Sequence, residues 1–181
     1  MWLVQWAKSR SERNEFGVPI QNFGKVTDAL YRGALPDREG YRALADKLHV
    51  RRVCSIIEHE SPEDARAALA SGIEEWRHFA FSDKDTPEPL GVRRWLAYIR
   101  TATPDRPVFT HCRGGRHRTG VLVGVLRVTD QGWTKERAFE EMLRYGWYSA
   151  IGHRPLLDWF LHQFDPADYA AGDAETRGTA A

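Results

Sequence analysis

The chain has 181 residues, 42% hydrophobic and 28% charged, which is the composition of one soluble globular domain. Its formal net charge is only +1, so the charge of the whole protein predicts no attraction to nucleic acid or to a membrane surface. Two cysteines, Cys54 and Cys112, are too few for a disulfide scaffold, and with neither a secretory leader nor a bilayer-length apolar run they favour a reduced, cytoplasmic setting.

The first half of the chain alternates short β-prone runs with amphipathic helical patterns. Asp37 and Ser61 each precede such a pattern and are residue types that cap helices well, and Pro62 suits a first helical position. We expect the second helix to pack through Ala68 and Leu69. The expected elements are an irregular lead-in at 1–19, a hairpin of strands at 23–26 and 30–32 at a sheet edge, a helix at 37–48, a strand at 50–57, a helix at 61–72 and a strand at 75–80.

The second half opens on a polar loop at 81–89 and then continues the same alternation. Residues 118–129 are apolar nearly all round, as a helix buried inside a domain should be. Thr134 caps the next helix, whose Met142 and Leu143 we expect to face inward. The other expected elements are a helix around 92–99, a strand at 108–110, a helix at 157–164, and a disordered tail at 166–181 in which no residue is buried.

This order of elements predicts the fold class. Strands alternate with helices and no repeat or linker divides the chain, so we expect one α/β domain at 20–165. Its central sheet should be mainly parallel and flanked by helices. Because such sheets bind ligands beyond the carboxyl ends of their strands, the stretch after the strand at 108–110 is the expected site.

That stretch reads Val-Phe-Thr-His-Cys-Arg-Gly-Gly-Arg-His-Arg-Thr-Gly from 108 to 120. A glycine-containing turn between a strand and a helix directs several backbone N–H groups to one point, where the helix dipole also favours an anion. Cys112 and Arg118 would lie at opposite ends of this cradle. A positive environment lowers the pKa of a thiol, so we expect Cys112 to be a thiolate nucleophile and the substrate to be an anionic electrophile such as a phosphate ester.

The order His-Cys-x5-Arg-Thr-Gly resembles the phosphate-binding signature of the cysteine-dependent protein tyrosine and dual-specificity phosphatases. The residues at 116–120, Arg-His-Arg-Thr-Gly, are similar to those of plant and fungal atypical dual-specificity phosphatases and their bacterial relatives. A second similar patch lies at 22–26 and 30–36, and the resemblance covers roughly residues 20–164. It implies a dual-specificity phosphatase fold and hydrolysis of phosphate monoesters or phosphoanhydrides through a phosphocysteine.

Each residue type in the signature suits a step of that chemistry. The planar guanidinium of Arg118 fits the equatorial oxygens of a phosphoryl group and offsets the charge of the transition state. The resemblance implies that Thr119 hydrogen-bonds the departing thiolate of Cys112. We expect His111 to order the loop through hydrogen bonds rather than to transfer protons, and His117 is of a residue type that can titrate near neutral pH. Gly114 and Gly115 are expected to allow positive φ angles in the loop. The residues expected to bind substrate are His111, Arg113, Gly114, Gly115, Arg116, His117 and Gly120.

An alkoxide leaving group needs a proton, and the family places an aspartate upstream of the signature for this purpose. Two aspartates in the polar loop are candidates, and the sequence leaves the choice between them open. Asp83 follows an aromatic residue and precedes Pro87, similar to the spacing of the family's acid loop, although Ser82 stands where proline is common. Asp85 is nearer to the cradle in sequence. No metal ion or other cofactor is required by this mechanism.

Several alternatives remain open at this stage. A rhodanese-like sulfurtransferase also places a cysteine at a strand-to-helix loop, and a phosphate-binding module without turnover would keep the same signature. Cys54 is expected in the core, with a protective disulfide to Cys112 as the alternative. The aromatic turn at 145–148 is expected to pack in the core rather than line the pocket. The natural substrate, whether a phosphoprotein, a phosphoinositide or an inositol polyphosphate, is not fixed by the sequence.

Overall fold

The computed structural model describes residues 14–148 and 153–171, which form a three-layer α/β domain around a five-stranded sheet. The strand order is β1-β2-β5-β3-β4, in which β1 pairs antiparallel with β2 and every other pairing is parallel. The strands are β1 (Gly24–Thr27), β2 (Leu30–Ala34), β3 (Arg52–Ser55), β4 (Glu75–His78) and β5 (Val108–Cys112). The expected hairpin is confirmed, with β1 at the sheet edge and β2 paired inward with β5.

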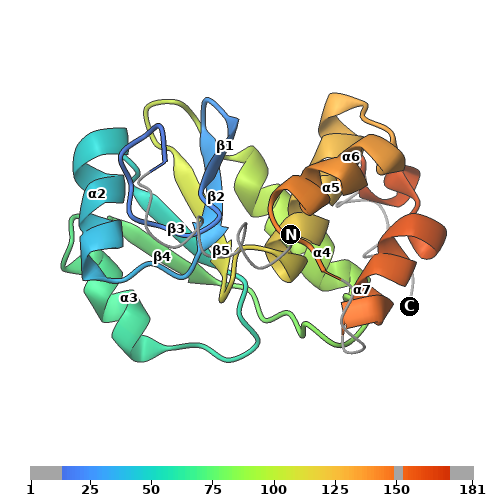
Figure 1. The fold of residues 1–181 in the computed structure, drawn as a ribbon, viewed down its shortest axis with the longest axis horizontal. Coiled ribbons are helices and arrows are strands. Elements are labelled where there is room, and N and C mark those ends of the chain that lie inside the picture. The colour runs from blue at the N-terminus through green and yellow to red at the C-terminus, as the bar shows by residue number, and fades with distance from the viewer. Residues whose placement is uncertain (1–13, 149–152, 172–181) are drawn as a thin grey trace, which may run out of the picture.

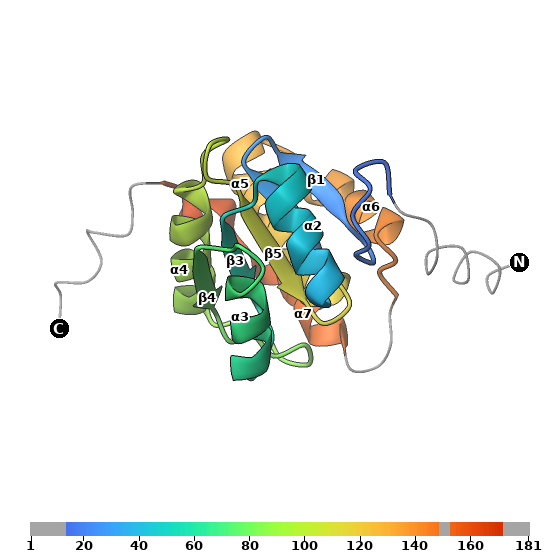
Figure 2. The ribbon, with the colours of Figure 1, turned by 90° about the vertical axis from the view of Figure 1, so that its left-hand side faces the viewer.

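Helices cover both faces of the sheet, as Figure 1 shows, and Figure 2 views α2 and α3 in front of the strands. Helices α4 to α7 lie on the opposite face, and the residues on the two faces form separate hydrophobic clusters. The helices are α2 (Arg38–Leu48), α3 (Pro62–Leu69), α4 (Pro89–Arg100), α5 (His117–Gln131), α6 (Lys135–Arg144) and α7 (Arg154–Asp158), continued by a π-helix at Trp159–Gln163 and a 3-10 turn at Pro166–Tyr169.

The expected helix caps are confirmed. Asp37 Oδ1 accepts a hydrogen bond of 2.8 Å from the Gly40 amide, and Ser61 Oγ accepts one of 3.2 Å from the amide of Asp64. Thr134 Oγ1 accepts the amide of Arg137 at 3.2 Å. Each of these side chains satisfies an amide that has no partner within its own helix, so the helix starts could be read from local sequence.

The centre of the sheet positions the functional residues. All five residues of β5 are buried, and the helices before and after this strand both lie on the α4–α5 face. The connections through α2 and α3 cross the other face, so the direction of winding changes at β5. Ligands of open parallel sheets bind beside the carboxyl end of a strand at such a switch point, and here that strand ends at Cys112.

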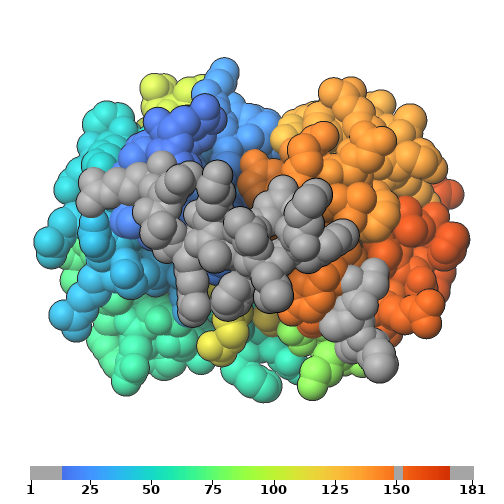
Figure 3. Space-filling model, viewed as in Figure 1, coloured from blue at the N-terminus to red at the C-terminus, as the bar shows by residue number. Residues whose placement is uncertain are grey.

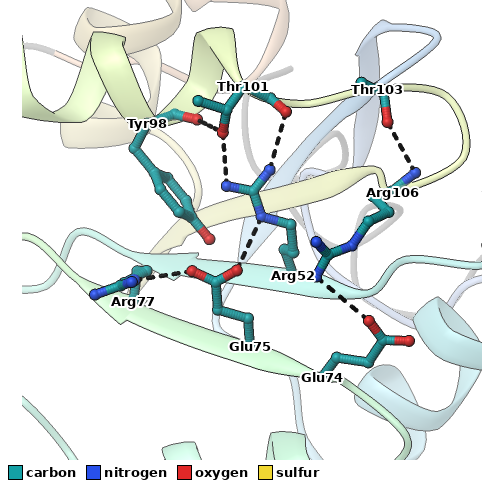
Figure 4. Close-up of polar contacts among 8 residues, drawn as sticks. All are labelled: Arg52, Glu74, Glu75, Arg77, Tyr98, Thr101, Thr103 and Arg106. Carbon is teal, nitrogen blue, oxygen red and sulfur yellow. Dashed lines mark hydrogen bonds and ion pairs between the residues drawn. The ribbon is translucent and has the colours of Figure 1, made fainter.

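A polar network stabilises the opposite, amino-terminal end of the sheet (Figure 4). The nearly buried Arg52 of β3 donates to Glu75 Oε2 on β4 at 3.2 Å. The same guanidinium donates to Thr101 at the end of α4, to the carbonyl at 3.2 Å and to Oγ1 at 2.8 Å. A buried guanidinium needs such partners, so the network fixes α4 against the strands rather than forming a second site.

Three expectations about packing are wrong. Leu69 is 48% exposed and Leu143 is 50% exposed, whereas Glu141 on α6 is buried and binds Arg127 of α5 through both carboxylate oxygens, at 2.7 and 3.2 Å. A buried arginine requires a buried carboxylate, so Glu141 faces inward where Leu143 was expected, while Met142 is buried as expected. In the expected tail, Tyr169 is buried against Trp159, while residues 172–181 lie outside the described part.

No helix in the described ranges is both long and apolar enough to span a bilayer. The expected cytoplasmic location stays a prediction.

Candidate active site

The turn between β5 and α5, residues 113–116, is here called the cradle loop, and its carbonyl groups are held from outside. Arg113 O accepts the Leu35 amide at 3.2 Å, and Gly114 O accepts Asn22 Nδ2 at 2.7 Å. Gly115 O accepts Nη2 of the fully buried Arg32 at 2.9 Å. With three successive carbonyls bound on one side, the loop amides are free to face the other side, where an anion can be held.

Arg32, which holds the cradle loop through the Gly115 carbonyl, is unusual because its charged side chain is completely buried. Its guanidinium carbon lies 3.9 Å from the centroid of the Tyr145 ring, a cation–π contact, while Nε and Nη1 have no hydrogen-bond partner. A positive charge is therefore enclosed beneath the cradle loop, where it adds to the attraction for an anion above. Neither Arg32 nor Asn22 could be singled out on chemical grounds from the sequence, where both appeared only within the second patch of family similarity.

Gly115 is the one cradle glycine whose conformation and position both exclude a side chain. Its φ is +66°, and an added Cβ would lie 2.5 Å from the backbone nitrogen of Ala34 and from the carbonyl carbon of Gly33. Gly114 has no positive φ and would place a Cβ in open space. The expectation that both glycines permit positive φ angles is thus met only at Gly115, whose Cα packs against the backbone of β2.

We therefore expect Gly115→Ala to lower the free energy of unfolding by about 1–3 kcal/mol, because the strained φ and the backbone clash must both be relieved. Displacement of the cradle amides should lower kcat/KM by about 100-fold as well. Gly114→Ala is the matched control and should unfold at the wild-type urea midpoint. Equal stability of the two variants in urea titrations would contradict this account of the loop.

Cys112 ends β5 at the bottom of the cradle and is only 3% exposed. Burial alone would raise the pKa of its thiol, but hydrogen bonding by Thr119, the charge of Arg118 and the amides of Thr119 and Gly115 outweigh burial and hold that pKa below its ordinary value. Thr119 Oγ1 also accepts the Cys112 amide at 2.9 Å. The side chains of Cys112, Arg118 and Thr119 are therefore brought together, with the thiolate favoured.

Arg118, the second residue of α5, links the cradle to the loop that follows β4. Its Nη1 donates to the Phe81 carbonyl at 3.2 Å, and its Nη2 lies 3.7 Å from Asp83 Oδ2. Asp83 lines the same cavity as Cys112, whereas Asp85 is exposed and does not line it. The structure thus supports Asp83 over Asp85 as the acid, a choice that the sequence left open.

These groups surround an open cavity of about 410 Å³ at the carboxyl end of the sheet. In Figure 1 the yellow turn after β5 and the green loop before α4 lie on the same lower edge, and the yellow atoms reach the surface there in Figure 3. Gln21, Tyr148 and His153 were not assigned to the site from sequence. The lining residues are Gln21, Asp83, Cys112, Arg113, Gly114, Arg116, His117, Arg118, Tyr148 and His153.

The assignment of His111 and Gly120 to the substrate-binding residues needs correction. His111 is fully buried, with its ring 5.7 Å from the rings of both Phe109 and Trp76, so it packs in the core and does not face the cavity. Its Nδ1 lies 3.4 Å from the Cys112 carbonyl and its Nε2 has no hydrogen-bond partner, so its role in ordering the loop stays a prediction. Gly120 lies within α5, where an added Cβ would be 3.3 Å from Met142 Cγ. It allows α5 and α6 to pack closely and does not line the cavity.

Burial lowers the pKa of His111 to about 4. The unfolded chain takes up this proton near pH 6.5 and the native protein does not, so the stabilisation is complete above about pH 6.5 and is lost as the pH falls towards 4. We expect the free energy of unfolding to fall by about 2–3 kcal/mol between pH 7 and 4.5 through His111 alone. Urea titrations of wild type and His111→Asn should show the smaller pH dependence in the variant; parallel curves would be contrary evidence.

His117 differs from expectation in its titration. Burial, followed by the neighbouring His153, lowers the pKa of His117 to about 4, so the expected titration near neutral pH is wrong. The two imidazole rings stack with centroids 3.7 Å apart. Arg113 is exposed and Arg116 half-buried at the cavity mouth, where both charges are available to a second phosphate of a ligand.

Cys54 is a core residue, as expected, and both cysteines are free thiols. Burial raises the pKa of the Cys54 thiol to about 12, so it is inert at neutral pH. The structure therefore gives no support to a disulfide between Cys54 and Cys112. Within the described residues, no group of three or more histidine, cysteine or carboxylate side chains is placed to hold a metal ion.

Comparison with known proteins supplies independent findings. The family model described as the tyrosine phosphatase family matches residues 17–174. Inositol diphosphatase DSP5 of Arabidopsis thaliana is 34% identical over 127 residues, which are 68% of this chain and 61% of that protein. Dual specificity protein phosphatase TpbA of Pseudomonas aeruginosa is 35% identical over 130 residues, 71% of this chain and 56% of that protein. The chain thus spans less than two thirds of either relative.

Solved structures show the same fold. The core catalytic domain of the PP-IP phosphatase SIW14 from S. cerevisiae, crystallised with citrate, superposes with a TM-score of 0.70 at 24% identity and covers 82% of this chain and 88% of that one. The P. aeruginosa TpbA structure superposes with a TM-score of 0.67 at 27% identity, over 81% and 86%. These likenesses confirm the α/β class and the phosphatase type of fold expected from the sequence.

Proposed function

The chain belongs to the tyrosine phosphatase family, and on that premise we propose that it is a cysteine-dependent phosphatase acting through a phosphocysteine intermediate. One observation carries the proposal. The Cys112 thiol has a lowered pKa at the bottom of an open cavity whose wall holds both Arg118 and Asp83. A nucleophile, a phosphate-binding guanidinium and an acid are thereby within reach of one phosphoryl group.

In the first step the Cys112 thiolate attacks phosphorus, forming an S–P bond as the bond to the leaving oxygen breaks. Arg118 and the cradle amides bind the equatorial oxygens, and the protonated Asp83 carboxyl donates its proton to the leaving oxygen. In the second step Asp83 accepts a proton from water while the water oxygen attacks phosphorus. The S–P bond breaks, inorganic phosphate leaves, and Thr119 stabilises the released thiolate.

The cavity mouth supports a substrate with more than one phosphate. Arg113 and Arg116 flank the cradle, and Tyr148 provides an aromatic wall 5.8 Å from the Arg116 guanidinium carbon. Arginine forks bind phosphate oxygens through paired charge-assisted hydrogen bonds. The relatives are named as inositol diphosphatases and as a dual specificity protein phosphatase, and we infer that an inositol polyphosphate or pyrophosphate is the substrate class here.

Release of inorganic phosphate from a panel of phosphotyrosine and phosphoserine peptides, phosphoinositides, inositol polyphosphates and inositol pyrophosphates tests this proposal. We expect the highest kcat/KM on an inositol polyphosphate or pyrophosphate. The highest value on a phosphopeptide would overturn the substrate class while leaving the phosphatase activity in place. Thiosulfate:cyanide sulfur transfer without any phosphate release would instead support the sulfurtransferase alternative, against which the family match argues.

A further inference from the structure

The loop that carries the proposed acid, residues 81–88 and here called the acid loop, is held over the cavity at three points. Two of them come from Arg118, which binds the Phe81 carbonyl and lies near the Asp83 carboxylate. The third comes from His153, just before α7, whose Nδ1 lies 2.8 Å from the backbone carbonyl of Asp83, 70 residues away in sequence. Because a carbonyl only accepts, Nδ1 carries the proton in this contact.

The His153 ring is held firmly in its position between the two loops. It stacks on His117, the first residue of α5, with ring centroids 3.7 Å apart and planes 19° from parallel. The Tyr148 ring stands nearly perpendicular to it, with centroids 5.8 Å apart. One imidazole therefore joins the backbone of the acid loop to the helix that begins at the cradle.

The two kinds of restraint respond differently to substrate. A phosphate in the cradle takes Arg118 as its own partner, so the 3.7 Å contact with the Asp83 carboxylate is given up when the acid is needed. The His153 bond goes to the Asp83 backbone, which has no part in binding phosphate. Asp83 is thus restrained at its carboxylate by Arg118 and at its backbone carbonyl by His153, and of these two restraints only the one from His153 persists when substrate is bound.

We propose that His153 is a positioning residue for proton donation: it fixes the Asp83 backbone so that the carboxyl stays beside the leaving oxygen after Arg118 has turned to the phosphate. This inference rests on the proposed phosphatase activity and on Asp83 as the acid. It assigns His153 no proton transfer and no contact with the phosphoryl group.

The test compares an alkyl phosphate, whose leaving group needs a proton, with p-nitrophenyl phosphate, whose phenolate leaves without one. His153→Ala should lower kcat/KM on the alkyl ester about tenfold and change kcat/KM on the aryl ester less than about twofold, because kcat/KM reports the step in which the leaving group departs. His153→Asn, whose amide can donate to the same carbonyl, should recover part of the loss. Arg154→Ala, at the adjacent exposed position outside the cavity, should match wild type on both esters.

A double mutant separates positioning from a general effect on the fold. If His153 acts through Asp83, then adding His153→Ala to Asp83→Asn should cause no further loss on the alkyl ester. Equal losses on both esters, independent losses in the double mutant, or no recovery in His153→Asn would overturn the inference. Wild-type turnover that disappears in Cys112→Ser establishes the proposed function separately. A wild-type protein that hydrolyses neither ester, and releases no phosphate from the inositol polyphosphates and pyrophosphates of the panel, would refute both.

Discussion

Cys112→Ser is expected to lower kcat by at least about 10⁴-fold, because it removes the group that forms the covalent intermediate. The hydrogen bonds of Thr119 and the charge of Arg118 stabilise a thiolate in the wild type, but a serine hydroxyl ionises far less readily and stays a weak nucleophile. Binding should persist, since the cradle amides and Arg118 are unchanged. Initial rates of phosphate release and calorimetric titration with a substrate that the wild type hydrolyses would measure the two effects.

Cys54→Ser provides the matched control for this substitution. Cys54 is fully buried in β3, its thiol has a raised pKa, and its side chain lies outside the cavity. The variant should retain activity within about twofold after any small loss of stability is allowed for. Retained turnover in Cys112→Ser, or loss of turnover in Cys54→Ser with an intact fold, would refute the assignment of the nucleophile.

Asp83→Asn is expected to lower kcat/KM about 10²–10³-fold on alkyl phosphate esters and only a fewfold on aryl esters, because the step that forms the phosphocysteine needs a proton only when an alkoxide leaves. Asparagine is nearly isosteric with aspartate, so the cavity keeps its shape. Its amide cannot donate an acidic proton, so only the acid catalysis is lost. The ratio of kcat/KM values on an alkyl and an aryl ester, measured at one pH, isolates the loss of acid catalysis, because kcat/KM reports formation of the phosphocysteine and not its later hydrolysis, which is the same for both esters.

Asp85→Asn is the control that separates the two carboxylates. Asp85 is exposed and outside the cavity, whereas Asp83 lies 3.7 Å from the Arg118 guanidinium, so Asp85→Asn should match wild type on both esters. A selective loss on alkyl esters in Asp85→Asn would move the role to that residue. Equal losses on both esters in Asp83→Asn would instead assign it to phosphate binding.

The sequence alone was sufficient for features that depend on neighbours along the chain. The caps at Asp37, Ser61 and Thr134 were correctly predicted, because a capping side chain bonds an amide within the next few residues. The pairing of Cys112 with Arg118 was predictable for the same reason. A strand, a short turn and a helix leave little freedom in how two residues six positions apart can face one anion.

Only the tertiary structure decided the contacts between distant segments. The approach of Asp83 to Arg118, the support of Gly115 by Arg32 and the bond from His153 to the acid loop each join residues far apart in sequence. The burial of Glu141 on α6 was decided the same way, by its pairing with Arg127. The apolar periodicity of a sequence predicts which residues share a helix face. The burial of a charged side chain depends instead on an oppositely charged partner, and only the fold brings the two together.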